Sequence, residues 1–97
     1  MALVSYAPRA LADLERLCDF LAESDPRTVS HTTDLILDAV AILTRHPLMG
    51  RPAEADLREL VISRGKSGYV ALYRYDSERD RVLLLALRHQ HEAGYAE

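Results

Sequence analysis

Residues 8–46, PRALADLERLCDFLAESDPRTVSHTTDLILDAVAILTRH, decide the fold because they hold two helical patterns separated by one short break. In the first pattern, from Pro8 to about Glu23, apolar residues recur at i, i+3, i+4 and i+7, which places them on one helical face. These residues are Leu14, Leu17, Cys18 and Leu21. The remaining surface of the helix is expected to carry Asp13, Glu15, Arg16, Asp19 and Glu23.

The break is Ser24-Asp25-Pro26, where Asp25 is a suitable N-cap and Pro26 suits the first position of a second helix. That helix is expected to run to about His46, because Pro47 ends it. Its apolar stripe consists of Val29, Thr33, Ile36, Leu37, Val40 and Leu43. A turn this short permits only an antiparallel hairpin, so both stripes should face one sheet.

The strands are predicted on either side of this hairpin. A short apolar stretch from Ala2 to Tyr6 precedes Pro8, and three strand-like runs follow, at 57–63, 69–75 and 81–89. Glycine and short polar residues separate the last three runs, as hairpin loops require. The order β-α-α-β-β-β predicts an α+β domain over residues 1–97, with an antiparallel helical hairpin packed on a small, mainly antiparallel sheet.

Two of the strand runs have informative patterns. Tyr69, Ala71, Tyr73 and Tyr75 alternate with other residues and form one face of their strand, which we interpret as cross-strand packing. The segment 82–87, VLLLAL, is apolar throughout, so we expect this strand inside the sheet with both faces covered.

The segment between the second helix and the next strand, 47–56, contains two prolines and Gly50. It predicts a fixed turn with Met49 as an anchor in the core. If Met49 is fully buried, truncating it to alanine should cost roughly 2–5 kcal/mol.

Composition bounds the function. With 97 residues and 48% apolar content, the chain is large enough for one core. Its longest apolar run is far shorter than the roughly 20 residues of a membrane span, and a signal-peptide pattern is missing, so we expect a cytoplasmic protein without a membrane partner. Net charge is −3, and residues 57–91 carry seven Lys or Arg against four acids. This local +3 is too small to predict sequence-specific nucleic-acid binding.

Familiar catalytic motifs are missing from the sequence, including a phosphate-binding glycine loop, a paired-cysteine metal motif and a nucleophile elbow. We therefore expect no cofactor. Cys18 is interpreted as a small core residue. His89 and His91 lie two apart on a strand, but a zinc site needs at least three protein ligands, so no metal site is expected.

The C-terminal cluster Arg88-His89-Gln90-His91, closed by Tyr95, is the remaining candidate for chemistry. His89 or His91 can shuttle protons on RNA, with Arg88 stabilising phosphate charge and Tyr95 assisting. The alternative is a polar strand end that only caps the sheet.

Four short motifs carry a resemblance to a known family. The loop His46-Pro47-Leu48-Met49-Gly50-Arg51-Pro52 resembles the His-Pro-x-Met-Gly-x-Pro stretch that follows the second helix in ParE-like proteins. The early Pro8-Arg9-Ala10-x-x-Asp13-Leu14, the pair Tyr73-Arg74 and the closing Leu87-Arg88-His89-Gln90 are similar to that family too. The chain therefore resembles the RelE/ParE toxin superfamily of type II toxin–antitoxin systems over nearly its whole length.

The resemblance implies a toxin held inactive by an antitoxin in a hetero-oligomer, and it allows two activities. ParE-like members poison DNA gyrase, and RelE-like members cut messenger RNA on the ribosome. The strand at 57–63 carries only Arg58, balanced by Glu59, and Val70 stands where RNA cutters often have arginine. We therefore favour a gyrase-directed, non-enzymatic toxin with a ParD-like antitoxin.

Two alternatives stay open beside the gyrase-directed reading: a ribonuclease using Arg88, His89, His91 and Tyr95, and an inactive interaction module. Candidates for contact with the target are Arg74, Arg88, His89, Gln90, His91 and Tyr95. Candidates for contact with the antitoxin are Leu17, Phe20 and Leu21.

Overall fold

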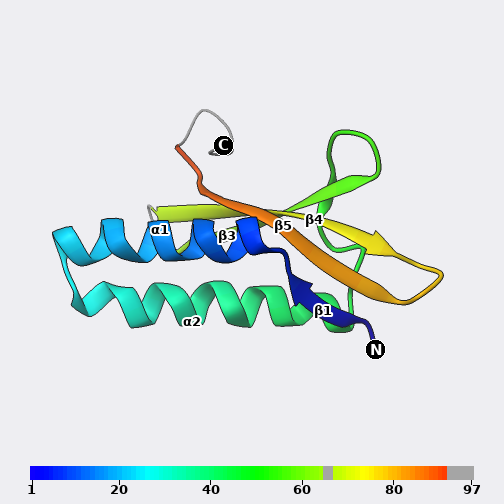
Figure 1. The fold of residues 1–97 in the computed structure, drawn as a ribbon, viewed down its shortest axis with the longest axis horizontal. Coiled ribbons are helices and arrows are strands. Elements are labelled where there is room, and N and C mark those ends of the chain that lie inside the picture. The colour runs from blue at the N-terminus through cyan, green and yellow to red at the C-terminus, as the bar shows by residue number, and fades with distance from the viewer. Residues whose placement is uncertain (65–66, 92–97) are drawn as a thin grey trace.

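A helical hairpin covers one face of a five-stranded sheet in the computed structural model, which describes residues 1–64 and 67–91 (Figure 1). The helices are α1 (Pro8–Ser24), α2 (Arg27–Ala41) and the short 3-10 helix η1 (Ile42–Thr44). The strands are β1 (Leu3–Tyr6), β2 (Arg51–Pro52), β3 (Leu57–Arg64), β4 (Ser67–Asp76) and β5 (Arg81–His89). The predicted α+β order is confirmed, with β2 as an additional strand. Within the described ranges, no helix is long and apolar enough to cross a membrane.

The N-cap of α2 is Pro26 rather than the predicted Asp25, but the turn between α1 and α2 is still held by Asp25. Its Oδ1 accepts the N–H of Arg27 at 3.1 Å, and its carbonyl accepts the N–H of Thr28 at 3.0 Å. These bonds satisfy groups that the start of α2 would otherwise leave unpaired. The second helix was expected from Pro26 to His46, but α2 begins one residue later and tightens into η1 after Ala41.

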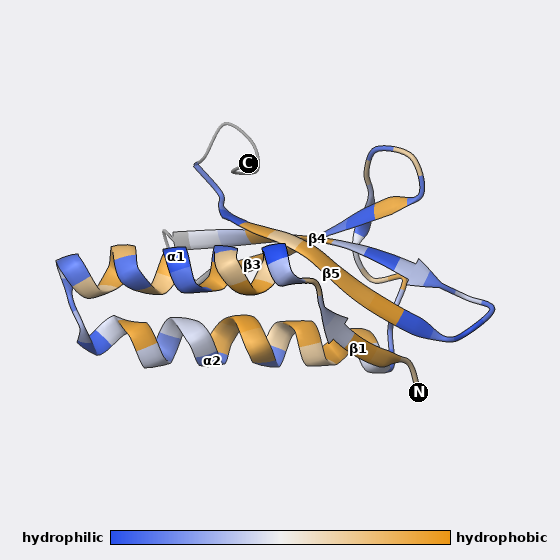
Figure 2. Ribbon diagram, in the orientation of Figure 1, coloured by the Kyte–Doolittle hydropathy of each residue, from blue (hydrophilic) through white to orange (hydrophobic). Residues whose placement is uncertain are grey.

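The sheet has the order β1-β5-β4-β3-β2, with β1 parallel to β5 and the other neighbours antiparallel. The prediction that β5 lies inside the sheet is confirmed, and this strand is hydrophobic through its middle (Figure 2). The expectation that both of its faces are covered is wrong at Leu83, which is 37% exposed. The helices lie over one face only, so a side chain on the other face depends on its neighbours in the sheet for cover.

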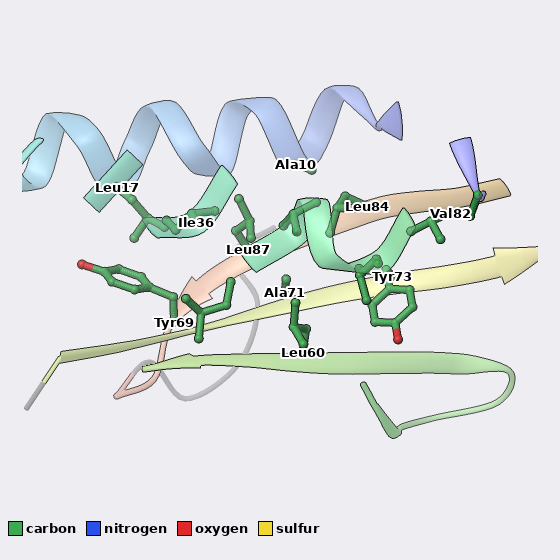
Figure 3. Close-up of a cluster of buried hydrophobic side chains, with 14 residues drawn as sticks. Ala10, Leu17, Ile36, Leu60, Tyr69, Ala71, Tyr73, Val82, Leu84 and Leu87 are labelled. Atoms are coloured by element: carbon green, nitrogen blue, oxygen red, sulfur yellow. The ribbon is translucent and has the colours of Figure 1, made fainter. Parts of the chain in front are cut away.

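The core lies between the hairpin and the sheet. It contains Ala2, Ala10, Leu17, Ile36, Val40, Leu43, Leu60, Ile62, Tyr69, Ala71, Tyr73, Val82, Leu84 and Leu87. The tyrosine face of β4 packs here, as predicted, with Tyr69 and Tyr73 at opposite ends of the cluster (Figure 3). Two residues were assigned to the wrong side of their helix. Leu37 is 41% exposed, and Asp13, expected on the polar side of α1, is only 5% exposed.

A β-bulge interrupts β5 in its second half. Tyr73 pairs with Leu84, whereas Leu72 pairs with Ala86, so Leu85 is an extra residue that has no pairing partner on β4. An inserted residue reverses which side chains face each side of a strand. Leu84 and Leu87 both belong to the core although they are three residues apart, which is the expected mark of this reversal.

The loop after η1 is held from inside by Tyr73. The Tyr73 hydroxyl donates to the carbonyl of Pro47 at 2.7 Å and accepts the N–H of Gly50 at 2.9 Å. Burial raises the pKa of Tyr73, which keeps its proton in place as a donor. The Arg58 guanidinium donates to the carbonyl of Gly50 at 2.8 Å. The fixed turn is therefore present as expected.

Met49 is not the anchor of this loop, contrary to prediction, because its side chain is 53% exposed. Gly50 occupies the buried position instead: a Cβ there would lie 2.6 Å from the Tyr73 ring, so only glycine allows the approach. The loop is closed by polar contacts to Tyr73, and Met49 is left on the outside.

Candidate functional site

A pocket of about 500 Å³ lies where the second half of α1 passes the ends of β4 and β5. Its lining combines apolar, aromatic and basic side chains. They are Arg16, Leu17, Phe20, Leu21, Tyr69, His89 and His91. The pocket thus joins two groups that the sequence analysis treated separately, the antitoxin candidates on α1 and two target candidates after β5.

On the helical side, residues 16, 17, 20 and 21 form a narrow strip because one helical turn separates the two pairs. Leu17 is buried and forms the floor, since it belongs to the core cluster. Phe20 also lines the pocket and is 63% exposed, so part of its ring faces solvent. An aromatic surface of this kind is suited to contact with a partner's apolar side chain.

On the sheet side, three rings meet at the end of β5. The His89 ring lies edge-on to Tyr69, with ring centroids 5.4 Å apart and an interplanar angle of 84°. The His91 ring lies 5.1 Å from that of His89. The backbone N–H of His91 donates to Nδ1 of His89 at 3.1 Å. In this arrangement Nδ1 is unprotonated, so a neutral His89 carries its proton on Nε2.

A buried carboxylate connects the two sides of the site. Asp13 lies one helical turn before Leu17, and its Oδ2 accepts the N–H of Leu87 at 2.9 Å. On this side of β5 the partner strand β1 ends at Tyr6, opposite Leu84. Asp13 therefore supplies a hydrogen-bond acceptor to β5 where strand pairing has stopped, which explains why a charged residue is buried there.

Arg74, a predicted target candidate, lies away from this pocket. It pairs in register with Leu57 and Leu83, near the far end of β4 from Tyr69. Its Nε forms an ion pair with Asp56 at 3.4 Å across an exposed surface. The structure thus does not bring Arg74 together with the C-terminal cluster.

The remaining candidates lie next to the pocket or outside the described residues. The Arg88 guanidinium donates to the carbonyls of His89 and Gln90, each at 3.3 Å. Gln90 is exposed, and its N–H donates to the carbonyl of Gly68 at 2.8 Å. Tyr95 lies outside the described residues. His89 and His91 are therefore the two target candidates that line the pocket.

Three residues of the site were not recognised as functional from the sequence: Asp13, Arg16 and Tyr69. Arg16 and Asp13 were assigned to the polar side of α1, and Tyr69 was assigned to packing. Tyr69 does pack, being 3% exposed, but its ring also lines the pocket. The spacing of Arg16 and Phe20, one turn apart beside an apolar stripe, is a signal that could have identified the strip.

The site as a whole suits recognition of another protein. A solvent-accessible aromatic pocket bordered by Arg16 and two histidines favours an apolar side chain with acidic neighbours. Within residues 1–64 and 67–91, no three His, Cys, Asp or Glu side chains lie close enough together to hold a metal ion.

Comparisons with known proteins identify the family. The model of the ParE toxin of type II toxin–antitoxin systems (parDE) matches residues 4–94. Toxin RelE3 of Caulobacter vibrioides is 36% identical over 92 residues, which cover 95% of this chain and 98% of that protein. The chain therefore belongs to the ParE toxin family within the RelE/ParE superfamily.

Solved structures agree on the fold. The chromosomal ParDE toxin–antitoxin system of P. aeruginosa contains a chain with a TM-score of 0.76 and 22% identity, covering 92% of this chain and 96% of that one. The RelBE2 toxin–antitoxin complex of Mycobacterium tuberculosis contains a chain with a TM-score of 0.59 and 28% identity, covering 92% and 98%. Both branches of the superfamily thus share this architecture.

Proposed function

We propose that this toxin acts by binding DNA gyrase and is neutralised by a ParD-like antitoxin, with the pocket beside Phe20 as its main protein-binding surface. Membership of the ParE toxin family supports the gyrase target. The observation that carries the proposal is the composition of the pocket, in which apolar and aromatic side chains predominate and Phe20 is exposed. Such a surface matches the anchor residues of protein interfaces.

The positions of the cations argue against RNA cleavage. Cleavage would need positive groups gathered around the scissile phosphate. Arg74 is at the other end of β4 beside Asp56, and the Arg58 guanidinium binds backbone carbonyls of the 47–50 loop. The guanidinium of Arg88 binds the carbonyls of its own strand end. Arg58 and Arg74 are therefore engaged away from the pocket, and of the arginines among the described residues only Arg16 lines it beside His89 and His91.

The hydrogen bond at His89 supports the same conclusion. A general base must offer a lone pair to the proton that it removes. Nδ1 of His89 already accepts the His91 N–H, and a neutral ring then holds its proton on Nε2. In this geometry Nδ1 of His89 is already occupied, so this atom does not offer a lone pair to a ribose hydroxyl.

The antitoxin is expected to cover the same pocket. Leu17, Phe20 and Leu21 line it together with His89 and His91, so an apolar antitoxin side chain seated on α1 would cover both histidines. β3 offers a second contact, because β2 pairs with it only opposite Arg58 and Glu59. An extended antitoxin tail can add a strand to the rest of this edge.

A ribonuclease is the second candidate function. The paired rings of His89 and His91 beside Arg16 and Tyr69 favour it, and the relative that is 36% identical carries the name RelE3. A toxin-like interaction module without activity is the third.

One pair of assays separates the candidates. Purified toxin is added to DNA supercoiling by gyrase and, in parallel, to ribosome-dependent translation of a defined messenger RNA. Accumulation of cleaved DNA with intact messenger is the expected result. Messenger cuts without gyrase inhibition would select the ribonuclease, and no effect in either assay, with the antitoxin still bound tightly, would select the inactive module. Phe20→Asp is the matched variant, and it should lose the gyrase effect while remaining folded.

A further inference from the structure

We infer that Asp13 is a positioning residue: its carboxylate holds the bulged register of β5 and thereby places His89, rather than Arg88, in the pocket. The position of His89 is a structural property and does not depend on the proposed function. Only the effect of that position on toxicity rests on the proposed function. Three observations carry it: the extra residue Leu85, the bond from Asp13 to Leu87, and the contact between His89 and Tyr69.

The first step concerns the phase of β5. Val82 and Leu84 face the helices and belong to the core. In a regular strand, positions 86 and 88 would continue this face, because side chains alternate with a period of two. That register would direct Arg88 toward α1 and His89 away from it. With Leu85 inserted, positions 87 and 89 take the helix side, and His89 meets the ring of Tyr69.

The second step concerns the backbone on the same side. The carbonyl of Leu84 accepts the N–H of Ala7, so the polar groups of residue 84 point toward β1. Backbone N–H groups along a strand point alternately to its two sides, so without the bulge the next N–H pointing toward the β1 side would be that of residue 86. With the bulge, the next N–H on that side is that of Leu87, and this is the N–H that Asp13 accepts. The carboxylate therefore binds a group that the bulged register alone presents.

The third step relates this bond to the pocket. One helical turn beyond Asp13 is Leu17, and two residues beyond Leu87 is His89. One helical turn advances about 5.4 Å and two strand residues advance about 6.6 Å. Because these lengths are similar, the bond that brings Asp13 beside Leu87 also brings Leu17 beside His89. These two residues do line the same pocket. Asp13 thus sets the register of the helix against the strand at the site.

Asp13→Ala tests the inference, with Asp13→Asn as the conservative variant and Asp19→Ala as a control at an exposed aspartate of the same helix. Nuclear Overhauser contacts between the rings of His89 and Tyr69 are measured by NMR. We expect them to be lost in Asp13→Ala and kept in Asp13→Asn, whose amide oxygen can still accept the Leu87 N–H, and in Asp19→Ala. A folded Asp13→Ala protein that keeps the ring contact would overturn the inference, because a residue needed only for stability would lower the melting temperature without moving His89.

Hydrogen exchange covers the case in which Asp13→Ala does not fold. In the unmodified protein the Leu87 amide should be protected, and in Asp13→Asn its exchange should be about five- to tenfold faster, because a neutral acceptor is weaker than a carboxylate. A Leu87 amide that exchanges as fast in the unmodified protein as an exposed amide would contradict the inference.

Growth arrest distinguishes this inference from the proposed function. Loss of both the ring contact and the arrest in Asp13→Ala, with both kept in Asp13→Asn, supports the two together. Loss of the ring contact with full growth arrest supports the positioning role of Asp13 and contradicts the assignment of the pocket as the working surface.

Discussion

Tyr69 and Tyr73 lie on the same face of β4, and both are buried, at 3% and 0% exposure, yet they make different contacts at opposite ends of the buried cluster (Figure 3). The Tyr73 hydroxyl turns to the backbone of the 47–50 loop and satisfies two polar groups. The Tyr69 ring contacts His89 at the edge of the pocket. One end is therefore closed by internal hydrogen bonds, whereas the other presents an aromatic surface to a partner.

The two ends of the cluster also differ in how they relate to the family motifs. The motif loop His46–Pro52 and the pair Tyr73-Arg74 are prominent in the sequence, but their polar atoms are used largely within the protein. Phe20 belongs to no quoted motif and yet lines the pocket with 63% of its surface exposed. We therefore expect substitutions at the two ends to separate stability from binding.

The largest effect is expected for Phe20→Asp on antitoxin binding. A charge in the apolar pocket should weaken the complex by about 2 kcal/mol or more, roughly 30-fold in Kd, if Phe20 is an anchor of the interface. Stability should change little because Phe20 is exposed. Isothermal titration with the antitoxin measures the effect, and Glu15→Lys on the exposed side of α1 is the control. Unchanged affinity in a folded Phe20→Asp protein would remove the pocket from the interface.

Tyr73→Phe should show the reverse behaviour. Removal of the hydroxyl leaves the Pro47 carbonyl and the Gly50 N–H without their partner, which should lower the free energy of unfolding by about 1–3 kcal/mol. Antitoxin affinity should stay the same because the pocket is at the other end. Urea unfolding followed by circular dichroism is the measurement. Stability equal to that of the unmodified protein would mean that the loop is held by other contacts.

His89→Ala should have a smaller and graded effect on the target. Loss of one partly exposed side chain from a recognition surface costs on the order of 1 kcal/mol, so the concentration for half-inhibition of gyrase should rise about fivefold. A general acid or base on RNA would instead lose roughly 10²-fold in rate. The two assays described above measure both quantities, and specific messenger cuts that vanish in His89→Ala would establish the ribonuclease.

Met49→Ala should have the smallest effect. The side chain is 53% exposed, so the change in unfolding free energy should stay within about 0.5 kcal/mol. Leu43→Ala is the matched comparison in the same region, because Leu43 is fully buried and its truncation should cost roughly 2–5 kcal/mol. Thermal denaturation of the two variants side by side gives the difference. A loss at Met49 as large as that at Leu43 would place its side chain in the core.

The sequence alone determined the order of the elements and most of their limits. Helical periodicity, the Ser24-Asp25-Pro26 break and the alternation in β4 are local patterns, and local patterns report which face of an element is apolar. They correctly predicted the hairpin, the position of β5 inside the sheet and the packing of the tyrosine face of β4. The sequence also identified His89 and His91 as candidates, because they lie two residues apart in the chain.

Only the tertiary structure decided how these elements meet at the site. A single inserted residue, Leu85, reverses the facing of everything after it in β5, and a periodicity argument gives no position for such an insertion. The role of Asp13 depends on a hydrogen bond between residues 74 apart in the chain. The helical pattern alone therefore places Asp13 among the exposed charged residues. Met49 was misassigned because the loop is closed by the hydroxyl of Tyr73, 24 residues later, which bonds the backbone of Pro47 and Gly50. Backbone groups are the same in every residue type, so the sequence does not indicate these bonds. Such contacts depend on the packing of distant segments, which local propensity does not encode.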